Sequence, residues 1–167
     1  MEWNKLLAIK WFKIYKNIWF GLFALGFLFF FIQEIPYIIM PFIKLANNPI
    51  MEMFRAYPIL NILEKITGIS TVIAMIFIIN QDTNPFPFDS VKDKLSFLLI
   101  IILLLGYYLG WIFYFNGRQD LLLVIAMLVA LPPLYYSSIG LWRKNYILVI
   151  LGIIFLFLHI ANVWTSY

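Results

Sequence analysis

Glu34 is the residue whose chemistry most needs an explanation, because it interrupts a long apolar stretch of the chain. Apart from Glu34 and its neighbour Gln33, the 26 residues Ile18–Ile43 are apolar. About 20 helical residues cross a hydrocarbon core of about 30 Å, so this stretch predicts a membrane span that carries a carboxylate. A helix that enters the membrane at Ile18 would bring Glu34 about 24 Å along its axis, close to the far interface.

Two interpretations of Glu34 follow from its place in a span. The first is a proton-relay or cation-binding carboxylate, since a charge in a span is costly and usually faces a cavity or a partner. The second is a structural charge near the outer interface that forms an ion pair. The candidate partners for such a pair are Lys44, Arg55 and Lys65.

Glu64 and Lys65 complete the candidate polar or ion site with Gln33 and Glu34. Because Glu64 and Lys65 are adjacent, their side chains point in different directions on a helix. They are interpreted as an anchor at the outer edge of the second span. The alternative is an ion pair between Lys65 and Glu34 that joins the first two spans.

A second group of polar side chains lies in the later spans and is the candidate lining of a cavity. Aromatic hydroxyls near the ends of spans are also ordinary interfacial anchors, so both interpretations stay open. The group consists of Tyr107, Tyr108, Tyr135, Tyr136, Ser137, His159 and Asn162.

His159 is the only histidine, and Asn162 follows it by about one helical turn. The chain has no cysteine, so a metal site at His159 would need carboxylates from other spans. We therefore expect His159 to form an interhelical hydrogen bond, and we predict neither a metal site nor a cofactor.

The sequence contains none of the GxSxG, HExxH or GxGD motifs of common hydrolases and proteases. The remaining route to acid–base catalysis is a pair of carboxylates, for which Glu34 and Glu64 are the candidates. The sequence favours a protein that is not an enzyme and predicts no catalytic residue.

Composition fixes the class of the elements that hold these residues. Hydrophobic residues make up 64% of the 167 and charged residues 12%, whereas soluble domains average about 45–50% and about 25%. We predict an all-α, polytopic integral membrane helical bundle that forms a single transmembrane domain over residues 1–167. Its five transmembrane helices are expected at about residues 18–40, 63–79, 95–115, 121–141 and 146–163.

Two further segments flank or connect the spans. Residues 3–16 place basic side chains opposite an apolar face that bears tryptophan, which is typical of an amphipathic helix lying in the membrane interface. Residues 44–65 mix polar and apolar types and are either a short surface helix or part of the second span. Asn80–Lys94 is predicted to be a non-helical loop.

Prolines and small residues predict how the spans bend and pack. Pro36 lacks the amide hydrogen that a helix needs, so a kink or early unwinding is expected around Gln33–Tyr37. Pro132–Pro133 should bend the fourth span near its middle. Small residues four apart let helix backbones approach closely, and such pairs are Gly106 with Gly110 and Ala126 with Ala130.

The distribution of Lys and Arg over the connecting segments predicts the orientation in the membrane. Eight of them fall on the side of the N-terminus and four on the other side, which favours an N-in, C-out topology. We expect a multi-pass protein of the cell (plasma) membrane. Richness in Ile, Phe, Lys and Asn points to a bacterial source, and nothing indicates nucleic-acid binding.

Three functions from different classes are compatible with these features. The small residues and the missing catalytic motifs favour a non-enzymatic accessory, immunity-like or scaffold component that acts through helix contacts, with a homo-oligomer or membrane-protein partner. The alternative is a small-molecule, lipid or ion binding or transport protein with Glu34 as its intramembrane carboxylate. The third is a lipid-modifying membrane enzyme.

Overall fold

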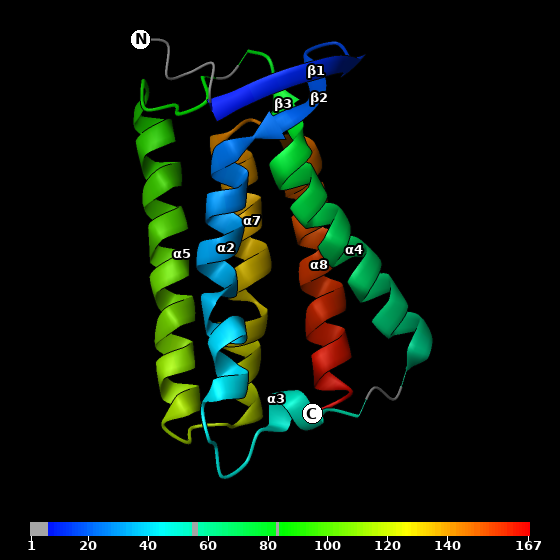
Figure 1. Cartoon of the computed structure of the whole chain (residues 1–167), viewed down its shortest axis with the longest axis vertical. Coiled ribbons are helices and arrows are strands. Elements are labelled where there is room, and N and C mark those ends of the chain that lie inside the picture. Colours follow the sequence, from blue (N-terminus) through cyan, green and yellow to red (C-terminus); the bar gives the residue numbers. More distant parts are fainter. Residues whose placement is uncertain (1–6, 55–56, 83) are drawn as a thin grey trace.

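The computed structural model describes residues 7–54, 57–82 and 84–167, and 69% of these residues are helical. Figure 1 shows a bundle of long helices with a small sheet at one end. Among the described residues, five helical stretches are long and apolar enough to cross a membrane, which agrees with the number of spans expected. Their bounds are Ala24–Phe42, Pro58–Phe77, Val91–Phe115, Leu121–Trp142 and Tyr146–Trp164.

The first correction concerns the N-terminal segment, where residues 8–15 form a strand and not the predicted interfacial helix. Strand β1 (Ala8–Tyr15) pairs antiparallel with β2 (Ile18–Phe23), and β2 pairs antiparallel with β3 (Ile78–Asn80). Lys16, at a φ of 43°, makes the tight turn between β1 and β2. Residues 3–6 of the predicted helix lie outside the described residues.

The sheet also changes the first span. Because β2 takes residues 18–23, the first helix α2 (Ala24–Ile39) begins six residues later than predicted and ends in a 3₁₀ turn, η1 (Met40–Phe42). The aromatic and β-branched residues of the N-terminal segment suit a strand as well as an amphipathic helix. A strand forms because β2 and β3 supply the backbone partners, which no local pattern in the sequence reveals.

The remaining helices pack around the fourth span. This span consists of α6 (Leu121–Leu123), the π-helix η2 (Val124–Val129) and α7 (Leu131–Trp142), and it is the most buried of the five. The helix α7 packs against the helices that precede and follow the fourth span. These are α5 (Val91–Phe115) and α8 (Tyr146–Trp164).

The second span, α4 (Pro58–Phe77), packs mainly against α8 and diverges from α2 away from the sheet (Figure 1). It begins five residues earlier than predicted, so the end of the ambiguous segment 44–65 belongs to this span. The preceding part forms a short helix, α3 (Pro49–Glu52), on the end of the bundle opposite the sheet. Tyr114 holds this segment, because its hydroxyl donates to Asn48 Oδ1 at 2.8 Å.

Side-chain caps set the true starts of two spans. Ser90 and Asp93 form a reciprocal capping box, so α5 begins at Val91 within the segment predicted to be a loop. Asn145 caps α8 and also donates to the carbonyl oxygens of Ala74 and Ile78, which ties the start of α8 to the end of α4.

The predicted unwinding around Gln33–Tyr37 does not occur, because α2 continues through Pro36 to Ile39. The Ile32 carbonyl, which Pro36 cannot bond, accepts a hydrogen bond from the Tyr108 hydroxyl at 2.5 Å. A neighbouring helix therefore replaces the bond that the proline removes.

The fourth span accommodates its prolines differently. A π-helical segment, in which the Ala130 amide donates to the Ile125 carbonyl, directly precedes the helix that contains Pro132 and Pro133. A single π turn shifts the register of the backbone hydrogen bonds. The disturbance predicted near the middle of this span is therefore a change of helix type.

Candidate functional site

The site begins with Gln33, which fixes the rotation of α2 within the bundle. Its side chain is only 2% exposed, and its Nε2 atom donates to the Tyr107 hydroxyl of α5 at 3.0 Å. The Tyr136 hydroxyl of α7 donates to Gln33 Oε1. Adjacent residues on a helix point about 100° apart, so these bonds also decide where Glu34 points.

Glu34 lies near the middle of the first span and not at its far edge. It is the eleventh of the 19 residues Ala24–Phe42, which places it about 15 Å along the helix. The expected position near the outer interface depended on a helix that began at Ile18, and β2 removes that premise. The carboxylate therefore lies deep within the candidate span.

Among the described residues, the Glu34 carboxylate makes no hydrogen bond or ion pair. Lys44 and Lys65, two of the candidate partners, are exposed and do not pair with it, while Arg55 lies outside the described residues. The alternative pairing of Lys65 with Glu34 is therefore not formed. Glu34 is half-buried, and its carboxylate borders open space within the bundle.

Two cavities adjoin Glu34. The first has a volume of about 200 Å³ and lies between α2, the fourth span and α8. Polar groups from α2, α7 and α8 face it together with aromatic rings. The lining includes Gln33, Glu34, Tyr37, Tyr136, Phe155 and His159.

The second cavity, of about 310 Å³, lies between α2, α4, α7 and α8. It shares Glu34, Tyr136 and Phe155 with the first cavity. The rest of its lining is apolar and comes from α2 and α4. These residues are Phe30, Gly68, Ile69, Val72 and Ile73.

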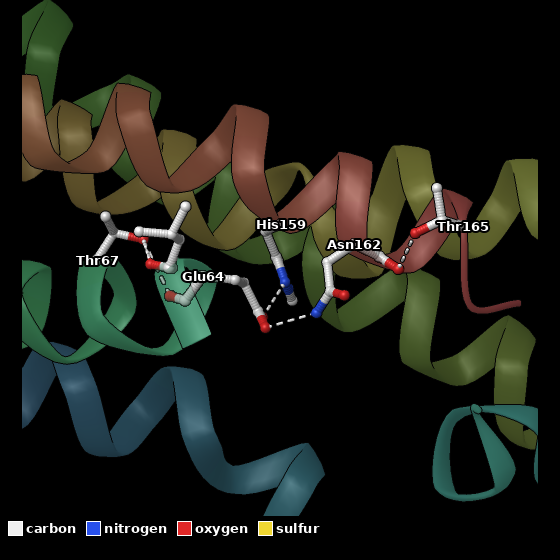
Figure 2. A network of polar contacts seen from close by, with 6 residues as sticks. Glu64, Thr67, His159, Asn162 and Thr165 are labelled. Atoms are coloured by element: carbon white, nitrogen blue, oxygen red, sulfur yellow. Dashed lines mark hydrogen bonds and ion pairs between the residues drawn. The ribbon is translucent and has the colours of Figure 1, made fainter. Parts of the chain in front are cut away.

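His159 lines the first cavity, and a carboxylate from another helix holds its ring, as Figure 2 shows. Its Nδ1 atom lies 2.7 Å from Glu64 Oε1, and Asn162 Nδ2 donates to Glu64 Oε2, also at 2.7 Å. The His159 ring stacks on Phe155 with 4.9 Å between ring centroids. The interhelical hydrogen bond predicted for His159 is thereby confirmed.

The partner of His159 also determines its chemistry. A carboxylate accepts hydrogen bonds, so His159 Nδ1 carries the hydrogen that points to Glu64. The other ring nitrogen, Nε2, has no hydrogen-bond partner among the described residues. The lining of the first cavity therefore includes two ionisable side chains, Glu34 from α2 and His159 from α8.

Glu64 itself does not have the role that the sequence indicated. It is buried, at 8% exposure, in the contact between α4 and α8, whereas the expected anchor at the outer edge would be exposed. Lys65, one position later, is exposed. Glu34 and Glu64, the two carboxylates considered for catalysis, have different surroundings. Glu64 bonds to His159, whereas Glu34 lines the cavities.

The other candidate cavity residues serve the helix packing. Besides the bond from Tyr108 to Ile32, the Tyr135 hydroxyl donates to the Phe29 carbonyl at 3.1 Å and Ser137 Oγ donates to the Pro133 carbonyl at 2.8 Å. Of the predicted lining, Tyr136 and His159 line the two cavities beside Glu34. Tyr107 and Asn162 support them, through Gln33 and Glu64 respectively.

The small residues pack within the chain. A Cβ atom on Gly110 would lie 2.6 Å from Met127 Cβ, and one on Gly106 would lie 3.0 Å from Leu131 Cδ1, so this glycine pair faces the fourth span. Ala126 is exposed and Ala130 is partly buried.

Phe155, Tyr37 and Gly68 belong to the site but could not be recognised from the sequence. Phe155 lies one helical turn before His159, which was the one local signal for it. No protein family matches the chain, and searches of curated proteins and of solved structures find no similar protein.

Proposed function

We propose that this chain is a membrane-embedded binding or transport protein for a small cationic ligand, with Glu34 as the group that recognises the charge. One observation carries the proposal: a carboxylate in the middle of a span, without a partner among the described residues, faces two cavities. Ionisable groups inside spans commonly mark the path of an ion or substrate. The cavities supply the space that such a ligand needs.

The charge of the surroundings favours a cation. No lysine or arginine among the described residues lines either cavity. The first cavity is lined by Glu34, whose carboxylate attracts a positive charge. In a medium of low dielectric constant, this attraction is much stronger than it would be in water.

The aromatic lining supports the same conclusion. The rings of Tyr37, Tyr136 and Phe155 face the first cavity, and the faces of aromatic rings attract organic cations. An organic ammonium ion would thus meet a carboxylate and aromatic rings together, which suits it better than it suits a strongly hydrated metal ion.

The scaffold or accessory function favoured by the sequence has less support than the binding function. It was based on the small residues and on the missing catalytic motifs, and of these small residues Gly106 and Gly110 contact the chain's own fourth span. We propose a multi-pass protein of the plasma membrane, with the sheet on the inner side as the basic residues predict.

Binding of tetramethylammonium tests the proposal, because this permanent cation does not titrate and is small enough for one cavity. Equilibrium dialysis of the protein in nanodiscs of zwitterionic lipid should show saturable binding. Replacing Glu34 by Gln should weaken that binding at least about tenfold, since the ligand loses its charged partner.

The control variant is Asp89→Asn, which removes the same charge from an exposed loop residue and should leave binding unchanged. Binding that is absent, or that Glu34→Gln leaves intact, contradicts the proposal. Uptake of the labelled cation into proteoliposomes then distinguishes transport from binding.

A further inference from the structure

We infer that the ligand is a single-chain cationic amphiphile, with its ammonium head at Glu34 and its apolar tail in the second cavity. The inference rests on the proposed function and names the class of ligand. It explains why a charged group lies between two cavities of different character, one with several polar side chains in its lining and one that is otherwise apolar.

The two cavities adjoin at shared residues. Glu34, Tyr136 and Phe155 line both, so a ligand head at Glu34 lies at the border between the two spaces. Their volumes of about 200 and 310 Å³ fall, taken together, in the range of sites for small organic molecules. One ligand can therefore occupy both.

The second cavity suits a hydrocarbon chain. Beyond the shared residues, its lining consists of Phe30, Gly68 and three branched aliphatic side chains of α4. Gly68 keeps this space open, because a Cβ atom there would lie 3.1 Å from the Phe155 ring. Nothing in the apolar part offers a hydrogen bond to a polar or sugar-like ligand.

The same cavity is accessible from the side of the bundle. Ile69 and Ile73 line it and are 63% and 46% exposed, on a helix whose outer face would contact lipid. A tail dissolved in the bilayer can thus reach the second cavity from the exposed side of α4. Lateral access removes any need for the tail to cross water.

Charge decides between a cationic amphiphile and the neutral or anionic alternatives. The head would lie beside Glu34, and an anionic head would be repelled there. A neutral tail gains little from leaving the bilayer for the cavity, because lipid chains are as apolar as the aliphatic side chains. The charge at Glu34 therefore selects a cationic head, and the second cavity selects a ligand with a single apolar chain.

The test compares octyltrimethylammonium with tetramethylammonium in the same nanodiscs. Val72→Trp, which fills the second cavity, should weaken octyltrimethylammonium binding at least about tenfold because the tail loses its space. Tetramethylammonium binding should change by less than about twofold, which also shows that the variant is folded. Ile73→Trp provides a second filled cavity, and Ile62→Trp, on the exposed side of α4 outside the cavity, should change neither ligand.

Three other outcomes would contradict the inference, and one of them would also contradict the proposed function. If tetramethylammonium depends on Glu34 but both cavity-filling variants leave octyltrimethylammonium unchanged, the inference fails and the proposed function stands. Octanol and tetramethylammonium can each be added as a competitor of bound octyltrimethylammonium. If the two competitors are equally effective, the cationic head is not recognised and the inference fails. If neither ligand depends on Glu34, the proposed function fails as well.

Discussion

Gln33 is the residue on which the geometry of the candidate site depends, because it bonds to two helices at once. Tyr107 and Tyr136 belong to two different buried clusters of the bundle, and Gln33 connects them. The hydrogen bonds also leave Glu34, one position later, facing the cavities. Loss of Gln33 should thus affect both stability and ligand binding.

We predict that Gln33→Leu lowers the free energy of unfolding by about 1–3 kcal/mol, because two buried hydroxyls lose their partner. Adding Tyr107→Phe and Tyr136→Phe to Gln33→Leu should recover part of that loss, since the unsatisfied hydroxyls are removed. Reversible unfolding in mixed micelles measures both variants. A triple variant less stable than Gln33→Leu would contradict this account.

Arg143 is a buried cation at the end of α7 beneath the sheet, outside the candidate spans. Its Nη1 atom donates to the Asn84 carbonyl at 2.5 Å, and its guanidinium lies 4.1 Å from the centre of the Phe23 ring. Burial lowers the pKa of Arg143 to about 10, so the side chain remains charged at neutral pH. The C-terminal end of a helix also favours a cation.

Arg143→Lys should therefore destabilise the protein by about 1–2 kcal/mol, because an ammonium lacks the planar shape that stacks on Phe23. The matched control is Arg118→Lys, where the arginine also lies over a ring, that of Phe113, but is exposed. That control should stay within about 0.5 kcal/mol of the parent. Equal losses in the two variants would refute the role given to burial.

The candidate site was predictable at the level of single residues but not as an assembly. Glu34 and His159 stand out because ionisable groups are rare in apolar spans. Their surroundings depend on how far each helix is rotated and shifted against its neighbours. A helical wheel does not contain that information, so Glu64 was assigned to an edge when it is buried against His159.

At the scale of elements, α2 depends on α5 to remain helical at Pro36. The bond from Tyr108 to the Ile32 carbonyl predicts a specific energetic coupling. Tyr108→Phe should cost about 1 kcal/mol in the parent and much less when Pro36 is replaced by Ala, because the alanine amide can then bond Ile32. A double-mutant cycle on the free energy of unfolding measures this coupling, and additive effects would disprove it.

The glycine pair of α5 makes a second prediction about packing. Gly110→Ala should destabilise the protein by about 1–3 kcal/mol, because its Cβ atom would lie 2.6 Å from Met127 Cβ in the facing helix. Gly106→Ala is the matched control, since its nearest neighbour is the flexible end of Leu131. Size-exclusion chromatography should show the same oligomeric state for both variants, and a dissociated oligomer would instead place the pair at an interface between chains.

The N-terminal hairpin shows why one element was mispredicted. A segment of alternating basic and aromatic residues satisfies the pattern of an interfacial helix and that of an edge strand. The strand pattern forms because β2 pairs with β3. The strand β3 directly follows α4 and lies about 60 positions after β2 in the sequence. Contacts over such distances in sequence do not appear in a local periodicity.

At the scale of the whole molecule, the number of spans was predictable because a bilayer imposes it. Each crossing needs about 20 apolar residues in a helix, and this length is visible directly in the sequence. The ends of the helices were less predictable, since caps at Ser90 and the strand β2 moved them by several residues. The cavities were not predictable, because they lie between helices whose crossing is set by packing.

The orientation of the bundle gives the last prediction. β1 and the C-terminus lie at opposite ends of the bundle (Figure 1), as an odd number of crossings requires. The chain contains no cysteine, so single cysteines can be introduced at Lys13 in β1 and at Lys44 beyond η1, both of which are exposed. With the basic side inside, an impermeant maleimide should label Lys44→Cys in intact cells and Lys13→Cys only after permeabilisation. The reverse pattern would invert the topology and place the sheet, with its lysines, on the outer surface. Labelling of both positions in intact cells would mean that the chain inserts in two orientations, which a binding site near the middle of the membrane would tolerate.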